Sequence, residues 1–456
     1  MTGAPGARAR AALLRGITRN VVALGVVSLL TDISSELLIY VVPLFLANVL
    51  AATPSVIGLI EGIAESVAAF VKLGSGALSD RIGRRTVLVG AGYSASVAAK
   101  SLYIVATAWP VVLVARVGDR IGKGIRTAPR DALIADSTAP EARGRAFGLH
   151  RAMDTTGAVI GVALAALIVG AVQGDDSTLQ GETFRLLALA ALVPGVLALV
   201  AIAVGVRDVP RPVPVPVPMP AAEQVPGPAP APEPTARPRS APEPVPVPAP
   251  GREPVAEPPP GPVAAPASTA GLWRGFPAAF WIFVAASGLF TLGNSSDAFI
   301  ALRSQALGVS VRDLLVIVIA FNIVDALVAW PVGALSDRIG RRRLIAIAWS
   351  LYAITYAGLA LAGSPSAVLP LWLLYGAYYG VNEAVGRALV ADLARPELRA
   401  TAYGILNAVT GLAILPASIV AGLLWDRLGQ PAPFWFGAAC AAGGLALLAF
   451  VRPPRR

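Results

Sequence analysis

A segment of ten residues, Gly-Ala-Leu-Ser-Asp-Arg-Ile-Gly-Arg-Arg, occurs twice in this chain without a change. It occupies 76–85 in the first half and 333–342 in the second half, an offset of 257 residues. Self-similarity at a fixed spacing indicates an architecture built from repeated units. Each copy follows one long apolar run and precedes another. The repeat is therefore a short basic turn between two hydrophobic helices, present once in each half.

The composition places those helices in a membrane. Hydrophobic residues make up 55% of the 456 residues and charged residues only 14%, whereas about 25% charged residues are usual in soluble domains. Apolar runs of about 20 residues, the length that crosses a bilayer as a helix, recur along the chain. We expect an all-α polytopic membrane protein with twelve spans. The spans are predicted at 19–49, 54–79, 86–107, 110–130, 146–172, 184–206, 276–302, 310–335, 343–363, 366–392, 400–424 and 432–451.

The distribution of arginine predicts the orientation. Arginines follow the second, fourth, eighth and tenth predicted spans and flank both ends of the chain, whereas the intervening turns are poor in arginine. The positive-inside rule then predicts cytoplasmic N- and C-termini and a multi-pass protein of the cell (inner or plasma) membrane. This pattern accounts for the net charge of +10, and it leaves no basic face for nucleic acid once the helices are in lipid.

A proline-rich tract separates the two halves. Pro, Ala, Val and Glu dominate 207–270, a composition that cannot bury a core and that favours extended polyproline conformations. We predict a disordered cytoplasmic linker that tethers two six-helix bundles, 19–206 and 271–452, with cytoplasmic ends at 1–18 and 453–456. A docking site for a partner protein is the alternative interpretation of the tract.

Several function classes lack the residues they need. The chain has one cysteine and one histidine, too few for an internal disulfide or a cysteine-based metal site. No GxxxxGK[ST] phosphate-binding loop occurs, which argues against an ATP-driven pump. No Ser/His/Asp order or cluster of metal ligands indicates an embedded enzyme. We therefore expect a protein that is not an enzyme and that needs no cofactor or metal.

A second repeat extends the first. The pattern Ala-Leu-x-Ala-Asp at 132–136 recurs at 388–392, an offset of 256 residues. The basic turns, Gly-x-Leu-x-Asp-Arg-x-Gly-Arg-Arg, resemble the signature of the major facilitator superfamily between its second and third and its eighth and ninth helices. The resemblance covers nearly all of the chain except the proline-rich tract. It implies that family's fold, two six-helix bundles related by pseudo-two-fold symmetry, and transport of a small-molecule substrate through the lipid bilayer by alternating access, for which a monomer suffices.

The resemblance also implies a role for the two basic turns. In the family, the acid and the arginines of this motif clamp neighbouring helices on the cytoplasmic side and form a conformational gate. A carboxylate suits a helix N-terminus, and a glycine lets the turn adopt a left-handed conformation. Orientation by positive charge alone is the alternative, but it leaves the repeated Asp and Gly unexplained. The implied gate residues are Asp80, Arg81, Gly83, Arg84, Arg85, Asp337, Arg338, Gly340 and Arg341.

The fourth predicted span resembles the family's fourth-helix motif. Arg120, Lys123 and Gly124 occupy the places of its arginine, polar residue and glycine, with lysine where glutamine is usual. That motif is linked with proton coupling, which the resemblance therefore implies for Arg120. The fifth predicted span has Gly157 and Gly161 but no Gly-Pro pair, and so departs from the motif associated with drug/proton antiporters.

Two carboxylates lie near the middle of the first predicted span. Asp32 and Glu36 are four residues apart and share a helix face. Charges inside a span are costly and mark functional sites. A carboxylate that is protonated on one side of the membrane and deprotonated on the other would couple protons to transport. First-helix acids often carry the proton in similar family members, which makes Asp32 the first choice. A permanent pair with a base such as Arg120, for the fold alone, is the alternative.

Other polar side chains inside the predicted spans are candidates for the substrate cavity. They are Glu61, Glu65, Arg116, Asp119, Asn294, Asp297, Asn322 and Asn382. Glu61 and Glu65 either line the cavity or pair with Lys100 of the third span. The asparagines are expected to be neutral substrate contacts, because spans one, four, seven and ten line the cavity in similar transporters. The tyrosines of the tenth span wall that cavity or form an interfacial belt. His150 and Asp154 form either a proton relay or a surface pair.

These observations favour proton-coupled transport of a small molecule, with efflux preferred over uptake. One alternative is uptake or facilitated transport of an organic anion held by Arg116, Arg120 or Lys123, and the neighbouring acids leave the charge of the substrate open. A different class would be a non-transporting membrane receptor or scaffold whose proline-rich tract binds a partner. The several charges inside the spans argue against it, because they are costly and a scaffold has no use for them.

Overall fold

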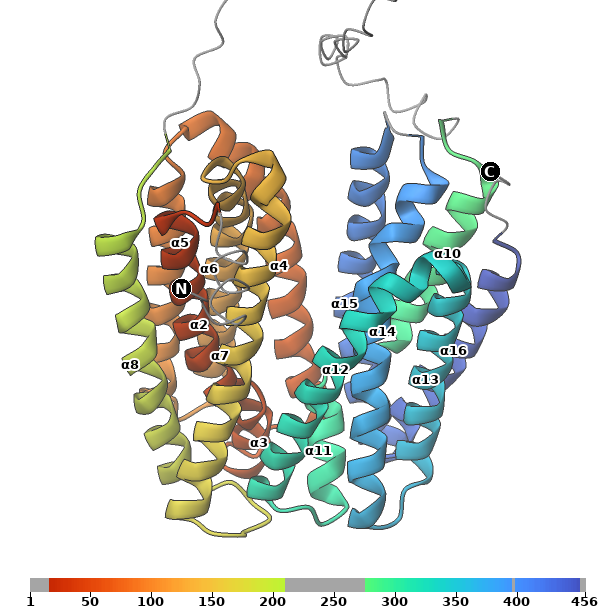
Figure 1. Ribbon diagram of the computed structural model, residues 1–456. Coiled ribbons are helices and arrows are strands. Elements are labelled where there is room, and N and C mark those ends of the chain that lie inside the picture. Colours follow the sequence, from red (N-terminus) through yellow and green to blue (C-terminus); the bar gives the residue numbers. More distant parts are fainter. Residues whose placement is uncertain (1–15, 210–274, 396–397, 452–456) are drawn as a thin grey trace, which may run out of the picture. The chain divides into compact units, whose positions relative to one another are not determined.

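The computed structural model describes residues 16–209, 275–395 and 398–451 (Figure 1). The predicted linker and the predicted terminal segments lie largely outside these ranges. Within the described ranges the backbone forms helices, turns and irregular segments, and no strand occurs. The described part of the chain is therefore all-α.

The helices form two series along the sequence. The first, red to yellow-green in Figure 1, is α2 (Arg19–Ile39), α3 (Val41–Asn48), α4 (Pro54–Ile82), α5 (Arg85–Ser101), α6 (Trp109–Asp136), α7 (Arg143–Val172) and α8 (Gly181–Gly205). The second, green to blue, is α10 (Ala278–Gly293), α11 (Ala298–Ala306), α12 (Val311–Ile339), α13 (Arg341–Leu361), α14 (Val368–Leu393), α15 (Arg399–Leu428) and α16 (Ala432–Ala449). Each predicted span coincides with one of these helices or, for the first and seventh spans, with two consecutive helices.

Within the described ranges, eight helical segments are long and apolar enough to cross a membrane. The long helices α4, α6, α12 and α14 are not among these segments. Helices α4 and α6 carry acidic and basic side chains along their apolar sequence. Charged side chains on membrane helices face the interior of the bundle, where they pair with one another or line a cavity. The charge content of α4 and α6 thus indicates interior helices that build the site.

The first long span of each series is interrupted. Helix α2 gives way to α3 at Tyr40, and α10 gives way to α11 across 294–297. Asn294 at the end of α10 has φ −87° and ψ 77°, outside the helical region. Irregular backbone at membrane depth is tolerated where it is buried in protein or lines a cavity, and interrupted helices are the usual sign of a transporter's binding site.

The packing of the first series is repeated in the second. Helix α2 packs on α7 and α8, α5 packs on α6 and α8, and α4 packs on α6. Correspondingly, α10 packs on α15 and α16, α13 packs on α14 and α16, and α12 packs on α14. Two contacts join the series, that of α4 with α15 and that of α12 with α7. Because α4 corresponds to α12 and α15 corresponds to α7, these two contacts are also equivalent. The two series are therefore related by pseudo-two-fold symmetry.

Two glycines of α7 allow it to approach α2 closely. A Cβ atom on Gly157 would meet the backbone of Leu29, and one on Gly161 would meet the backbone of Ile33 and the side chain of Glu36. Small residues permit such close contact between helices in a membrane. The glycines of the fifth predicted span thus have a packing role, and they bring α7 against the face of α2 that carries Glu36.

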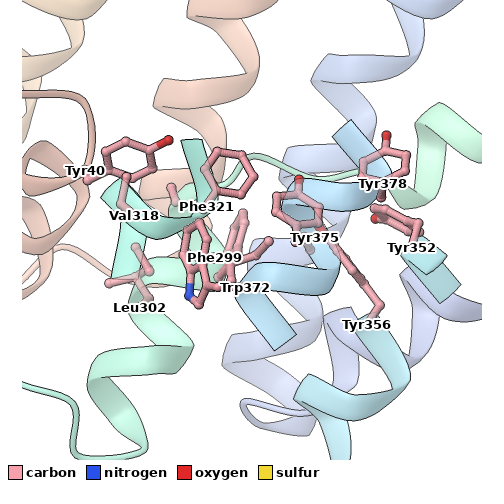
Figure 2. Packing of buried hydrophobic residues seen from close by; sticks show 14 of the residues in the cluster. Tyr40, Phe299, Leu302, Val318, Phe321, Tyr352, Tyr356, Trp372, Tyr375 and Tyr378 are labelled. Atoms are coloured by element: carbon pink, nitrogen blue, oxygen red, sulfur yellow. The ribbon is translucent and has the colours of Figure 1, made fainter. Parts of the chain in front are cut away.

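The core of the second series is rich in aromatic side chains (Figure 2). Trp372 and Tyr375 of α14 pack on Phe321 of α12, and Tyr378 packs on Tyr352 of α13. All five rings are buried, and edge-to-face and offset contacts of this kind stabilise a core beyond their buried area. The alternative of an interfacial belt is wrong for Tyr375 and Tyr378, because both lie in the interior.

Candidate functional site

A cavity of about 420 Å³, here the central cavity, is lined by residues of both helix series. From the first series, it is lined by the break between α2 and α3 and by helices α4 and α6. From the second series, it is lined by the irregular segment that joins α10 to α11 and by helices α14 and α15. Its charged lining residues are Glu61, Glu65, Arg116, Arg120, Lys123 and Asp297. The volume lies within the range of small-molecule sites, about 300–1,000 Å³.

Glu61 of α4 and Arg116 of α6 form a two-pronged ion pair. Arg116 Nε donates to Glu61 Oε1 at 2.9 Å, and Arg116 Nη2 donates to Glu61 Oε2 at 2.8 Å. Both side chains are buried. Ser296, from the second series, donates its hydroxyl to Glu61 Oε2 at 3.4 Å. A parallel fork of this kind is the strongest arrangement of arginine and carboxylate, so Glu61 holds the charge of Arg116.

A second pair lies one helical turn further along the same two helices. Arg120 Nε is 2.9 Å from Glu65 Oε1. The Glu65 side chain is 39% exposed and borders the central cavity. Residues four apart on a helix share a face, which is why the glutamates of α4 meet the arginines of α6 as two successive rungs.

Lys100 does not reach these glutamates. Its Nζ donates to the hydroxyls of Ser34 (3.0 Å) and Ser35 (2.8 Å) and lies 4.0 Å from Asp119 Oδ1. The alternative in which Glu61 or Glu65 pairs with Lys100 is therefore wrong, and both glutamates line the central cavity. The physical reason is that α6 is rotated so that its arginines face α4. From the sequence alone, these arginines and Lys100 were equally possible partners for the glutamates. Asp119 faces Lys100 rather than the central cavity.

Asp32 and Glu36 line a small cavity of about 50 Å³, here the acid pocket. Its other charged lining residues are Lys100, Arg116, Asp119, Arg120, Lys123 and Arg126. It has room for a few water molecules but not for a substrate. Neither Asp32 nor Glu36 has a hydrogen bond or ion pair from its carboxylate within the ranges that the structure describes. Arg120 lines the acid pocket as well, but its ion pair is with Glu65 and not with either of these acids.

His150 and Asp154 lie one turn apart on α7. His150 Nδ1 is 3.5 Å from Asp154 Oδ2, and the histidine is 4% exposed. The interpretation as a surface pair is wrong, because close packing of α7 takes His150 into the interior. Asp154 and Asp32 line the same pocket, of about 300 Å³, here the lateral pocket, and Lys123 lines it as well.

Among the residues that the structure describes, Asp297 is the one charged residue that the second series adds to the central cavity lining. The Tyr375 hydroxyl donates to its Oδ1 at 2.6 Å, and the Tyr379 hydroxyl lies 3.5 Å from its Oδ2. Both tyrosines come from α14, the helix that corresponds to α6. Sequence reasoning placed Asp297 in the cavity but did not find these hydroxyl partners, because the tyrosine positions matched an interfacial belt equally well.

The three asparagines expected to contact substrate are not brought together. Asn294 borders the central cavity and contacts the Tyr378 hydroxyl at 3.4 Å. Asn322 donates to the Val318 carbonyl of its own helix at 3.0 Å and borders the lateral pocket. Asn382 borders a separate cavity of about 470 Å³, which Asn294 also reaches. In this conformation, only Asn294 reaches the central cavity.

At the basic turns, each helix series forms an ion pair with the end of its fourth long helix. Arg85 pairs with Asp136 in the first series, and Arg341 Nη1 lies 2.7 Å from Asp392 Oδ1 in the second. These aspartates are the last residues of the repeated pattern at 132–136 and 388–392. The recurrence of that pattern was the signal that could have identified them as the partners of the arginines. Arg81, Arg84 and Arg338 are exposed, and the side chains of Asp80 and Asp337 lie outside the described residues.

The two copies of the basic turn differ in backbone although their sequences are identical. Gly83 has φ 71° and ψ −14°, and α5 begins two residues later. Gly340 has φ 92° and ψ 133°, and α13 begins at the next residue. Positive φ is the conformation that favours glycine. The second turn is thus one residue shorter, which converts the offset of 257 before the turn into 256 after it.

Comparisons with known proteins agree on one family. The family model described as Major Facilitator Superfamily matches residues 24–300 and 278–456. An uncharacterized MFS-type transporter of Methanocaldococcus jannaschii is 30% identical over 443 residues, 96% of each chain. The tetracenomycin C resistance and export protein of Streptomyces glaucescens is 28% identical over 127 residues, 27% of this chain and 24% of that protein. The crystal structure of a bacterial homolog of the human lysosomal transporter Spinster superposes with a TM-score of 0.66 over 94% of both chains, at 15% identity.

Proposed function

This chain belongs to the major facilitator superfamily, and from that premise we propose that it exports a small molecule in exchange for protons. Family membership makes it a multi-pass membrane transporter with an all-helical fold, and not an enzyme. The proton coupling, the direction of transport and the roles of individual residues are the proposed part.

The observation that carries the proposal is the acid pocket. Glu61 and Glu65 form ion pairs with arginines, whereas the carboxylates of Asp32 and Glu36 form no ion pair in the described ranges. A carboxylate that forms no ion pair takes up and releases a proton without the cost of breaking one. Asp32 and Glu36 therefore suit proton exchange, and the two paired glutamates suit the fold of the cavity wall.

A route for the proton is suggested by the lateral pocket. Asp32 and Asp154 both line it, and His150 lies within 3.5 Å of Asp154. Chains of neighbouring histidine and carboxylate side chains are the usual components of proton relays in membrane proteins. We propose that protons pass between Asp32 and the predicted cytoplasmic side through Asp154 and His150.

Alternating access supplies the conformational part of the mechanism. Hydrogen bonds between the two helix series gather at the ends of α3, α4, α11 and α15 that lie away from the basic turns, as in the pair of Ser55 with Asp426. That end is the predicted extracellular one, so this conformation fits a state closed to the outside. Protonation of Asp32 or Glu36 would bias the equilibrium between this state and its opposite, provided the two states bind the proton with different affinity.

Export is favoured over the uptake of an organic anion. Arg116 and Arg120 are two of the three cations that an anionic substrate was expected to use, and both pair with glutamates, which leaves only Lys123 of the three. Export also agrees with the name of the relative from Streptomyces glaucescens. The predicted cell-membrane location, cytoplasmic termini, monomeric state and tethering role of 207–270 are part of the same proposal.

Proton release from energised inverted vesicles tests this function. Vesicles that contain the full-length protein are acidified inside and followed with a pH-sensitive dye while cationic, anionic, zwitterionic and neutral compounds are added in turn. We expect at least one compound to dissipate the gradient with the wild type but not with Asp32→Asn. Asp313→Asn, which removes an exposed carboxylate, is the matched control and should behave as the wild type. A flat response to the whole panel would contradict antiport.

A further inference from the structure

The walls of the central cavity differ in chemistry at equivalent positions. Residues of α6 and α14 correspond at an offset of 256, as the paired ends Asp136 and Asp392 establish. At this offset Arg116 and Lys123 of α6 correspond to Trp372 and Tyr379 of α14, and of these four residues Arg116, Lys123 and Tyr379 line the central cavity. One half thus presents charges where the other half presents aromatic rings, so the pseudo-symmetric fold encloses an asymmetric site.

Most charges of the central cavity neutralise one another within the protein. Six charged residues are described on its lining, and the pairs of Glu61 with Arg116 and Glu65 with Arg120 neutralise four of them. Lys123 is an exposed side chain on the cavity wall, and in the described part of the chain it has no hydrogen bond and no ion pair. Asp297 receives neutral tyrosine hydroxyls, and it has no cationic partner among the side chains described. One positive and one negative group therefore remain, on opposite halves of one cavity.

We propose that the central cavity binds a zwitterionic small molecule, with its anionic group at Lys123 and its cationic group at Asp297. This inference rests on the proposed function, because it names the class of molecule that the transporter carries. A ligand with both charges satisfies both side chains. A purely anionic or purely cationic ligand would leave Asp297 or Lys123 desolvated without a partner, and an unpaired polar group of this kind is costly.

The surroundings of Asp297 suit a cation. Tyr375 and Tyr379 hold the carboxylate through their hydroxyls, and Tyr40, at the break between α2 and α3, borders the same cavity. Aromatic faces attract ammonium groups, by about 0.5–2 kcal/mol according to exposure.

The position of Lys123 connects the substrate to the proton site. Its side chain borders the central cavity, the acid pocket and the lateral pocket. Within reach of these spaces it can face either the anionic group of the ligand or the carboxylates of Asp32 and Glu36. Arginine in its place would keep the charge, whereas methionine would keep only the aliphatic chain, so these two substitutions separate charge from bulk.

A binding measurement on the purified full-length protein tests the proposal. The zwitterionic probes are phenylalanine, γ-aminobutyrate and aminoethylphosphonate. Each is matched by an analogue without the cation (phenylpropanoate, butyrate, ethylphosphonate) and by one without the anion (phenethylamine, butylamine, ethylamine). We expect at least one zwitterion to raise the thermal unfolding midpoint and to bind at least about tenfold more tightly than both of its analogues. Equal binding of an analogue, or no binding by any zwitterion, would overturn the proposal.

Variants assign the two charged groups of the bound zwitterion. Lys123→Met should weaken its binding about tenfold or more, and Lys123→Arg should largely retain it. Asp297→Asn should weaken it similarly, while Asp313→Asn should have no effect. The midpoint without ligand reports whether each variant folds, and Lys123→Gln replaces Lys123→Met if that variant does not.

The proton measurement keeps this proposal separable from the proposed function. A zwitterion that binds through Lys123 and Asp297 but moves no protons in vesicles would contradict antiport and leave the substrate class standing. Proton movement driven only by singly charged compounds would have the opposite meaning. In that case antiport would stand, and the assignment of Lys123 and Asp297 to a zwitterion would be overturned.

Discussion

Asn48 and Gln305 form a reciprocal pair of amides between the two helix series. Asn48 Nδ2 donates to Gln305 Oε1 at 3.1 Å, and Gln305 Nε2 donates to Asn48 Oδ1 at 2.7 Å. The residues are 257 positions apart, the same offset as the two basic turns, so they occupy equivalent places in the two series. A contact between equivalent positions is what a two-fold axis produces in a dimer. The amide pair therefore lies near the pseudo-two-fold axis, at the end away from the basic turns.

Removal of this amide pair should open the predicted extracellular end more often. Gln305→Leu deletes both reciprocal bonds and leaves part of the Asn48 amide without a partner, a loss of about 1–3 kcal/mol. We expect a membrane-impermeant maleimide, added from outside, to label Thr291→Cys in the central cavity at least about five times faster. The measurement uses a Cys440→Ala background, although that cysteine is buried. Ser364→Ala, in the turn between α13 and α14, is the control, and an unchanged labelling rate in Gln305→Leu would contradict the gating role.

The two glutamate–arginine rungs should differ in their effect on stability. The side chains of Glu61 and Arg116 are 2% and 7% exposed, whereas that of Glu65 is 39% exposed. Glu61→Gln leaves a buried guanidinium without its counter-charge, which costs about 3–5 kcal/mol. Glu65→Gln should cost less, because water reaches the Glu65 carboxylate and weakens its pair with Arg120, a guanidinium that is as buried as that of Arg116. The temperature at which half of the detergent-solubilised protein aggregates measures this order. Equal losses in the two variants would mean that burial does not decide the effect.

The sequence predicted the helices of this fold far better than their pairings. Apolar runs fix where spans lie, because a helix in lipid satisfies its own backbone and needs only length and hydrophobicity. The partner of Glu61 depends on how α4 and α6 rotate about their axes, and Glu61 is 55 residues from Arg116. Lys100 was equally eligible from spacing alone. Asp32 and Glu36 were found because an acid inside a span is unusual wherever the helix turns.

The proline-rich tract should be dispensable for transport if it is only a tether. Deletion of residues 220–255 removes much of the repetitive Pro-Ala-Val sequence and leaves enough chain for a flexible connection. We expect proton-coupled transport in vesicles to stay within about twofold of the wild type, because no cavity-lining residue is changed. A scaffold that acts through this tract would instead keep its folded bundles and lose its output. Loss of transport with unchanged thermal stability would therefore contradict the tether.

The basic turns mark a limit of repeat-based reasoning. Ten identical residues predict the same structure twice, yet α5 begins two residues after Gly83 and α13 begins one residue after Gly340. The aspartates at the ends of α6 and α14 select which arginine faces them, and their offset of 256 differs from the offset of the turns. The tertiary partner thus overrides the local sequence. Alignment of the two copies alone would have paired Arg85 with Arg342 instead of Arg341.

Double-mutant cycles should detect this shift of one residue. In the first series, Arg85→Ala and Asp136→Ala should be non-additive, with a coupling of about 0.2–1 kcal/mol for a partly exposed pair. Arg84→Ala should add independently to Asp136→Ala, because Arg84 is exposed. In the second series the arginine coupled to Asp392 should be Arg341. Arg341 is the ninth residue of the repeated segment, whereas Arg85 is the tenth. Thermal midpoints of the single and double variants measure the coupling. Coupling of Arg84 rather than Arg85 to Asp136 would show that both copies share one register, and that the difference between the two turns has no energetic consequence.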